Sequence, residues 1–273
     1  MVNIYASSDN HFDLNNIDPA SVIKAQVEYL NEIRADYYLI AGDLFNDFQK
    51  SLTYVANLQS ELTNTKVLFI AGNHDMVNGV TYDELENGRW PGYLNNRYID
   101  VPNSDIRIIG LNGWYDYSFA VNVDKSEHQF YTWKETYWID RLISQPMSDI
   151  ERERIVLTQL ESQLEAAKAD SRQVVLMTHF VPNQAFIRYS KDFRFWNMAN
   201  AVMGSLKFEK ILDKYQVKAV VFGHIHEHLN PRRVNDTVYY NSAVGYNRKR
   251  HKEWQTDNFL SEWKLQLKKI ETF

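Results

Sequence analysis

Six short apolar runs constrain the fold more than any other feature of this sequence. They lie at residues 2–6, 37–41, 67–70, 106–109, 174–177 and 219–222. The runs are rich in Val and Ile and lack the alternation of apolar and polar residues that marks a strand with one face in water. Such runs are typical of strands in a sheet that is covered on both faces. The sequence therefore predicts buried strands with further layers on each side of them.

Amphipathic helical segments lie between these runs. Asp18, followed by a proline, gives an N-cap ahead of apolar residues at helical spacing, and Ser148 with Glu151 forms the pattern of a capping box. A third helix is predicted after Ser51. Alternation of strands and helices is typical of an α/β domain. Because we find no repeat, low-complexity tract or Pro/Gly/Ser-rich linker, we predict a single domain over residues 1–273.

Three segments depart from this alternation. Residues 112–147 and 182–196 are rich in aromatic side chains, and both are expected to be insertions over one face of the domain. Residues 247–273 are expected to form a C-terminal extension. The aromatic residues of 112–147 are compatible with a cap that stacks a nucleobase or another flat leaving group. The alternative, which we favour, is that the segment is a flap packed on the domain or an oligomer interface.

The chain contains eight His and no Cys. The absence of Cys excludes a disulfide framework, a Cys-ligated zinc or iron–sulfur site and a thiol nucleophile. A metal ion would have to be bound by His, Asp, Glu, Asn and backbone oxygen. The formal net charge of −5 argues against sequence-independent nucleic-acid binding, which usually needs a basic face.

The sequence offers no membrane or secretion signal. It begins without the basic and apolar regions of a signal peptide, and no apolar run approaches the roughly 18 residues that span a bilayer. We therefore expect a cytoplasmic protein with no membrane partner.

Polar clusters follow five of the six apolar runs at the point where each run ends. In chain order they are Asp9-Asn10-His11, Gly42-Asp43, Gly72-Asn73-His74-Asp75, Thr178-His179 and Gly223-His224-Ile225-His226. Each fragment alone is weak evidence, because short motifs arise often by chance. In open α/β sheets, however, ligands bind beyond the carboxyl ends of the strands. Five such clusters therefore predict one shared site at one edge of the sheet.

This ordered series resembles the calcineurin-like metallophosphoesterases. The resemblance covers residues 9–226 and is specific, because all five blocks occur in the expected order. It implies a four-layer α/β/β/α sandwich of two mixed β-sheets flanked by helices, with a dinuclear metal centre at the edge of the sheets. It also implies that a hydroxide bridging the two metal ions attacks phosphorus.

The resemblance implies a ligand set, residue by residue. Asp9, His11 and His226 would bind the first metal ion, Asn73, His179 and His224 would bind the second, and Asp43 would bridge the two. These nitrogen and oxygen donors suit divalent or trivalent Mn, Fe or Zn.

The remaining members of the site are assigned from the same resemblance. His74 would be a proton donor or charge stabiliser at the leaving-group oxygen, with Asp75 orienting its ring. One position departs from the family pattern, because Asn46 stands where a second Asp is usual. That position is generally outside the set of metal ligands. Arg188 and Arg194 are candidate phosphate contacts, although a solvated basic face would explain them equally well.

The expected function is metal-dependent hydrolysis of a phosphate ester on a small molecule. We favour a phosphodiester, because His74 would protonate a poor alkoxide leaving group. The alternative is a phosphomonoesterase or nucleotide phosphohydrolase on the same site. A non-catalytic interaction scaffold of the same fold is less favoured, because the block around His74 is complete. A nucleic-acid substrate is not expected, given the acidic chain.

Overall fold

Two mixed β-sheets form the centre of the molecule. In the computed structural model, which describes residues 2–272, the first sheet has the order β12-β1-β2-β3 and the second has the order β4-β5-β6-β7-β9-β8. The strands of the first sheet are β1 (Ile4–Ser7), β2 (Tyr37–Ala41), β3 (Lys66–Ile70) and β12 (Lys268–Ile270). Those of the second are β4 (Arg97–Asp100), β5 (Ile106–Leu111), β6 (Gln173–Thr178), β7 (Ala219–Phe222), β8 (Arg232–Val234) and β9 (Thr237–Asn241). The six predicted strands are all present.

Each sheet combines parallel and antiparallel pairs. β1, β2 and β3 run parallel, whereas β12 pairs antiparallel with β1. In the second sheet β5, β6, β7 and β9 run parallel, and β4 and β8 add antiparallel edges. The parallel strands place their carboxyl ends at the same edge, where the polar clusters follow them.

The two sheets pack face to face, which explains why the predicted strands show no polar alternation. Along β2, Tyr37, Leu39 and Ala41 belong to the apolar layer shared with the second sheet. Tyr38 and Ile40 point the other way and pack in the layer beneath the helices. Both faces of the strand are buried, so both sets of alternating side chains are apolar.

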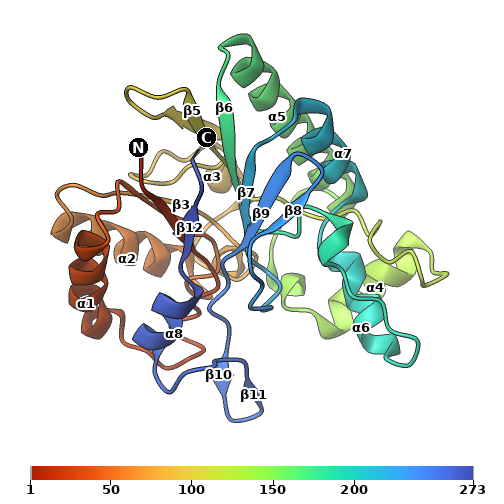
Figure 1. The fold of residues 1–273 in the computed structure, drawn as a ribbon. Helices are drawn as coiled ribbons and strands as arrows, with labels where there is room; N and C mark the ends of the chain where they lie inside the picture. Colours follow the sequence, from red (N-terminus) through yellow and green to blue (C-terminus); the bar gives the residue numbers. More distant parts are fainter. Residues whose placement is uncertain (1, 273) are drawn as a thin grey trace.

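Helices cover the outer faces (Figure 1). On the side of the first sheet lie α1 (Pro19–Glu32), α2 (Phe48–Glu61) and α8 (Phe259–Gln266), and on the side of the second lie α5 (Asp149–Ala169) and α7 (Leu206–Tyr215). The predicted sandwich of two mixed sheets flanked by helices is thus confirmed. Shorter helices are α3 (Tyr82–Asn87), α4 (Glu127–Tyr137) and α6 (Arg194–Ala199), with 3₁₀ turns η1 (Asp75–Val77), η2 (Ile139–Leu142), η3 (Gln184–Phe186) and η4 (Asn200–Val202).

The predicted helix starts are correct in two cases and wrong in one. Asp18 caps α1, and Ser148 forms the full capping box of α5 with Glu151. α2 begins at Phe48 rather than after Ser51, because the side chain of Asp47 accepts a hydrogen bond from the backbone of the first turn.

The two aromatic-rich segments meet on one side of the molecule. Within 112–147 the first aromatic residues, Trp114 to Phe119, are buried, and Trp114 donates a hydrogen bond to Asp149 at the start of α5. The same segment continues into α4 and η2. α4 packs beside α6, which belongs to the second aromatic segment (Figure 1).

Within the predicted extension 247–273, the described residues 247–272 form a hairpin of β10 (Asn247–Arg248) and β11 (His251–Lys252), then α8 and β12. The hairpin projects from the body of the molecule, whereas β12 returns to pair with β1 (Figure 1). Trp263 of α8 is fully buried and donates a hydrogen bond to Tyr38 of β2 over 2.8 Å. Among residues 2–272, no helix has the length and apolarity needed to cross a membrane.

Candidate metal centre

The five polar clusters meet at the carboxyl edge of the two sheets, as the sequence predicts. They follow β1, β2, β3, β6 and β7 respectively. The seven predicted metal ligands lie together, and most are inaccessible to solvent: Asp9, His11 and His179 are 0% exposed, and Asp43 and Asn73 are 2% and 1% exposed. Buried polar groups at this density require partners.

The backbone of this edge is held in an unusual conformation. Asp9, His11, Asp43 and His224 have φ angles of 52°, 44°, 59° and 67°, in the left-handed region that residues with a side chain rarely adopt. Such strain persists only where the surroundings impose it, and it is concentrated at functional sites. The left-handed turns direct these side chains from the strand ends into one space.

Two glycines allow the strand ends to approach each other. Gly42 has a φ of +89°, and a Cβ atom there would lie 2.8 Å from Nδ1 of His179. A Cβ atom on Gly72 would collide with the carboxylate of Asp43. Glycine is therefore required before both Asp43 and Asn73.

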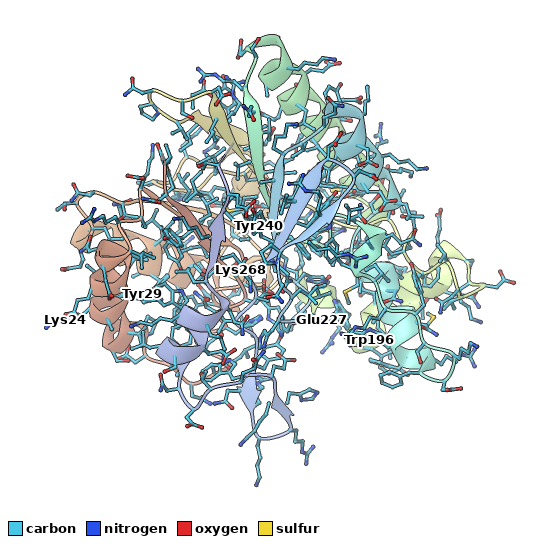
Figure 2. All side chains as sticks on the ribbon, viewed as in Figure 1. Lys24, Tyr29, Trp196, Glu227, Tyr240 and Lys268 are labelled. Atoms are coloured by element: carbon cyan, nitrogen blue, oxygen red, sulfur yellow. The ribbon has the colours of Figure 1, made fainter. Side chains whose placement is uncertain are left out.

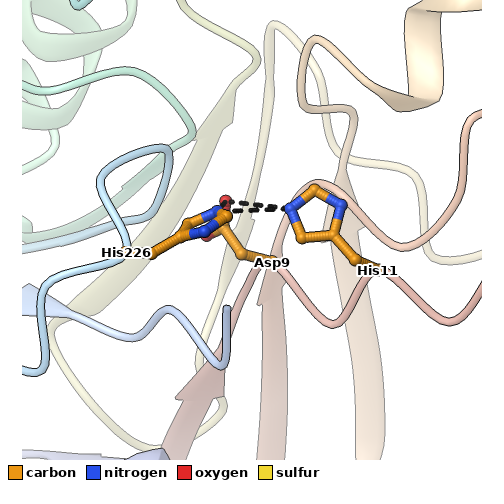
Figure 3. Close-up of side chains that lie close together, drawn as sticks. All are labelled: Asp9, His11 and His226. Atoms are coloured by element: carbon orange, nitrogen blue, oxygen red, sulfur yellow. Dashed lines mark hydrogen bonds and ion pairs between the residues drawn. The ribbon is translucent and has the colours of Figure 1, made fainter. Parts of the chain in front are cut away.

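A first group of donors comprises Asp9, His11 and His226, whose side chains point toward one another (Figure 3). Nε2 of His226 lies 3.2 Å from Nε2 of His11 and 3.2 Å from Oδ1 of Asp9. The three residues come from the loops after β1 and β7, more than 200 positions apart in the chain. This arrangement offers two imidazole nitrogens and one carboxylate oxygen to a common point.

A second group of donors comprises Asn73, His179 and His224. Oδ1 of Asn73 lies 3.0 Å from Nε2 of His179 and 3.1 Å from Nδ1 of His224. Those two nitrogens are 3.2 Å apart. Asp43 lies between the two groups: its Oδ2 is 3.7 Å from Nε2 of His11 and 3.4 Å from Nε2 of His179.

The outward nitrogens of three of these histidines bind acceptors. Nδ1 of His179 donates to the carbonyl of Ala41 over 2.8 Å, and Nε2 of His224 donates to the carbonyl of Val202 over 3.2 Å. Nδ1 of His226 donates to Oε2 of Glu253 over 2.7 Å. Each bond places a ring proton on the outer nitrogen, so the nitrogen that faces the centre is the one that can coordinate a metal ion.

This donor set fits a pair of metal cations. Facing lone pairs about 3 Å apart repel one another unless a positive charge lies between them. The carboxylates of Asp9 and Glu253 also favour positive charge at the centre. Burial alone would lower the pKa of His226, but the hydrogen bonds and negative charge of these two carboxylates raise it to about 10. The site thus attracts positive charge, and nitrogen and oxygen donors without thiolate are those that first-row metal ions accept.

Two acidic residues that the sequence analysis did not identify hold this arrangement from outside. Asp140, in η2, is 1% exposed and accepts a hydrogen bond from Nδ2 of Asn73 over 2.7 Å, so that Oδ1 of Asn73 faces the histidines. Burial raises the pKa of Asp140 to about 7. Glu253, directly after β11, orients His226 as described above. In the sequence, Asp140 stands out only as an acidic residue in a largely apolar stretch. No sequence pattern points to Glu253.

The surroundings of His74 correct one prediction. Nδ1 of His74 lies 2.6 Å from Oδ1 of Asn46, so Asn46 orients the ring, and Nε2 lies 3.3 Å from the hydroxyl of Tyr246. The prediction that Asp75 orients this ring is wrong. The Asp75 carboxylate instead accepts hydrogen bonds from the backbone of residues 43–45 and Gly72, and thereby ties the ends of β2 and β3 together.

A cavity of about 760 Å³ opens onto the centre and is lined by Asp43, Asn73, His74, His224 and His226 among others. Arg188 also lines it, and its Nε pairs with Oε1 of Glu227 over 2.8 Å. Arg194 lies at the exposed start of α6 and is not part of the cavity lining. Figure 2 shows Trp196 on α6 and Glu227 in the loop after β7, which both line the cavity.

Comparison with solved structures shows the same fold in proteins of low sequence identity. A phosphopantetheinyl hydrolase from Mycobacterium tuberculosis has a TM-score of 0.70 at 16% identity, covering 98% of this chain and 95% of its own. A dimetal phosphatase from Danio rerio has a TM-score of 0.52 at 13% identity, covering 88% of this chain and 87% of its own. The comparison with curated proteins gave no match.

A protein-family model identifies the family directly. The model for calcineurin-like phosphoesterases matches residues 2–228, which is most of the chain and includes all five polar clusters. The chain therefore belongs to the calcineurin-like phosphoesterase family and is a phosphoester hydrolase.

Proposed function

We propose that the protein hydrolyses phosphodiesters of small molecules with the help of two divalent or trivalent metal ions. The observation that carries this proposal is the pair of buried donor groups joined by Asp43. Asp9, His11 and His226 would bind one ion, Asn73, His179 and His224 the other, and Asp43 both. Mn, Fe or Zn suits these donors. When bound, two such ions would lower the pKa of a shared water towards neutrality and neutralise the phosphoryl oxygens.

The residues of the chain perform the remaining tasks. Asn46 holds Nδ1 of His74, so Nε2 faces the cavity and can deliver a proton to the departing oxygen of the ester. The hydroxyl of Tyr246, 3.3 Å from that nitrogen, can hold the ring in place until the substrate arrives. Arg188, at the cavity wall, is the proposed contact for a phosphoryl oxygen; Arg194 remains a proposal from the sequence.

The size of the cavity favours a phosphodiester over a phosphomonoester. The cavity of about 760 Å³ is far larger than one phosphoryl group and leaves room for organic groups on both ester oxygens. His74 would serve either reaction, because both kinds of alkyl ester release an alkoxide that needs a proton. Phosphomonoester and nucleotide hydrolysis on the same site is the second candidate, since Asp43 and the six other proposed ligands would serve both.

Metal removal is the test of this proposal. The protein is incubated with EDTA, and release of p-nitrophenol is measured from bis-p-nitrophenyl phosphate and p-nitrophenyl phosphate before and after Mn²⁺ is restored. We expect hydrolysis to be lost with EDTA, to return with Mn²⁺, and to be faster on the diester. A phosphopantetheinyl conjugate and a mononucleotide extend the panel. Metal-independent turnover would overturn the two-metal proposal, and a faster monoester reaction would reverse the preference.

Glu253 provides a second prediction, because it fixes the proton on Nδ1 of His226. In Glu253→Gln the neutral amide is a weaker acceptor than a carboxylate, so the facing nitrogen becomes a poorer donor to a metal ion. We expect metal affinity to fall by about 10- to 100-fold, measured by titration calorimetry with Mn²⁺. Asp257→Asn, an exposed acid on the same segment, is the matched control and should bind as wild type. Unchanged affinity in Glu253→Gln would exclude this role.

A further inference from the structure

The cavity above the metal centre is lined by two unlike sets of side chains. Tyr246, Arg248 and Glu253 come from the hairpin region and are polar or charged. Tyr137, Trp138, Phe195 and Trp196 form an aromatic wall contributed by α4, α6 and the residue that follows α4. The hairpin and the α4–α6 pair lie in different parts of the molecule (Figure 1). We refer to the four aromatic residues as the aromatic wall.

The aromatic wall is built by packing between the two helices. The ring of Phe195 lies 5.1 Å from that of Trp133, which is buried in α4, and 5.8 Å from that of Tyr137. These distances are those of favourable aromatic pairs. Even so, Tyr137 remains 59% exposed and Phe195 43% exposed. A contiguous group of exposed aromatic side chains inside a cavity is typical of a surface that binds an apolar ligand.

The aromatic wall is connected to the metal centre through the chain itself. Tyr137 and Trp138 immediately precede η2, whose Asp140 accepts the hydrogen bond from Asn73. Asp140 is buried, so the start of η2 is held in a fixed position beside Asn73. A group bound to phosphorus at the metal centre would therefore lie within reach of the aromatic wall, because both line the same cavity.

The aromatic wall itself carries no ionic side chain. Arg188 lines the cavity, but its guanidinium is paired with Glu227 over 2.8 Å, so the pair adds little net charge. No other ionic side chain belongs to α4–α6 within the described lining. Two further basic side chains, Arg248 and His251, line the cavity from the side of the hairpin. At the aromatic wall itself, a flat apolar group on the substrate would bury the exposed rings.

We propose that the aromatic wall binds an uncharged aromatic or other flat apolar substituent esterified to the phosphorus of the substrate. The inference rests on the proposed function for the position of the phosphoryl group. It names the substrate class as phosphoesters with a planar apolar substituent, and assigns the 112–147 and 182–196 segments a shared binding surface.

The test compares two non-hydrolysable ligands that differ by one phenyl ring, benzylphosphonate and methylphosphonate. Their dissociation constants are measured by calorimetry on Mn²⁺-loaded protein, so the result does not depend on turnover. We expect benzylphosphonate to bind wild type about tenfold more tightly, given the area that a buried ring removes from water. In the double variant Tyr137→Ala/Phe195→Ala this preference should fall below about twofold, with methylphosphonate binding unchanged.

Two neighbouring aromatic residues give a matched control. Tyr131 of α4 is 47% exposed and Phe193, just before α6, is 57% exposed, and neither lines the cavity. Tyr131→Ala/Phe193→Ala should keep the full preference for benzylphosphonate. Equal binding of both ligands to wild type, or a preference that survives in the cavity variant, would overturn the inference. If neither phosphonate binds the metal-loaded protein, both the proposed function and this inference are wrong. If both phosphonates bind with equal affinity, only the proposed role of the aromatic wall is wrong.

Discussion

Replacing His74 with Ala is expected to slow hydrolysis of an alkyl phosphodiester by about 10²- to 10⁴-fold, the usual contribution of a positioned general acid. The same variant should hydrolyse bis-p-nitrophenyl phosphate with a much smaller loss, because p-nitrophenolate leaves without a proton. The ratio of kcat/KM for the two esters measures the effect. It separates proton donation from a general loss of binding.

His74 also lies close enough to His11 and Asp43 to be counted among possible metal donors. Metal content therefore serves as the control. If His74→Ala binds as many metal ions as wild type and loses alkyl-ester turnover, the ring acts on the leaving group. If the variant loses a metal ion, or if both esters slow equally, the assignment as a proton donor is wrong.

The contact between Asn46 and His74 also predicts how hydrolysis depends on pH. Burial lowers the pKa of His74, so the protonated ring is lost, and alkyl-ester hydrolysis falls, as pH rises through that lowered value. In Asn46→Asp a carboxylate would lie at the position now 2.6 Å from Nδ1, favour the charged ring and raise its pKa. The falling limb of the pH profile should move to higher pH. A limb that stays in place would show that another group titrates.

The strands and their clusters could be predicted because each is a local pattern. Residues 37–41 and 219–222 are apolar on both faces, and their bounds agree with β2 and β7. The edge strands β8 and β12 could not be found in this way. β8 carries exposed arginines and β12 two lysines, since an edge strand has one side in water. β12 pairs with β1, which lies at the other end of the chain, whereas β8 pairs with the adjacent β9 and lacks only an apolar pattern of its own.

The site was predictable where a residue directly follows a strand and unpredictable where contact is made across the fold. Asp9 and His179 belong to short motifs in a fixed order. Asp140 reaches Asn73 from 67 residues away, and Glu253 reaches His226 from 27 residues away. Neither contact leaves a pattern in the sequence. The ring-orienting role of Asn46 was assigned to Asp75 for a similar reason, because the direction of a loop side chain depends on the turn geometry.

Asp43→Asn is expected to have the largest effect of any single substitution. The amide keeps the shape of the side chain and can still accept the hydrogen bond that His74 donates from its backbone over 2.9 Å. It removes the one negative charge that lies between the two donor groups. Because metal ions contribute several kcal/mol to such reactions, we expect hydrolysis to fall by at least about 10³-fold. Elemental analysis should show fewer than two ions per chain.

Thermal unfolding distinguishes this loss from simple misfolding. In the metal-free protein, burial and repulsion from the carboxylate of Asp43 raise the pKa of Asp75 to about 7. Removing the charge should leave the metal-free protein at least as stable. Ligand that binds only the folded state raises stability in proportion to its binding free energy. Wild type should therefore gain Tm on addition of Mn²⁺, as should the exposed control Asp124→Asn, whereas Asp43→Asn should gain little. A full gain in Asp43→Asn would mean that this carboxylate does not join the two groups, and the metal centre would have to be assigned again from the remaining donors.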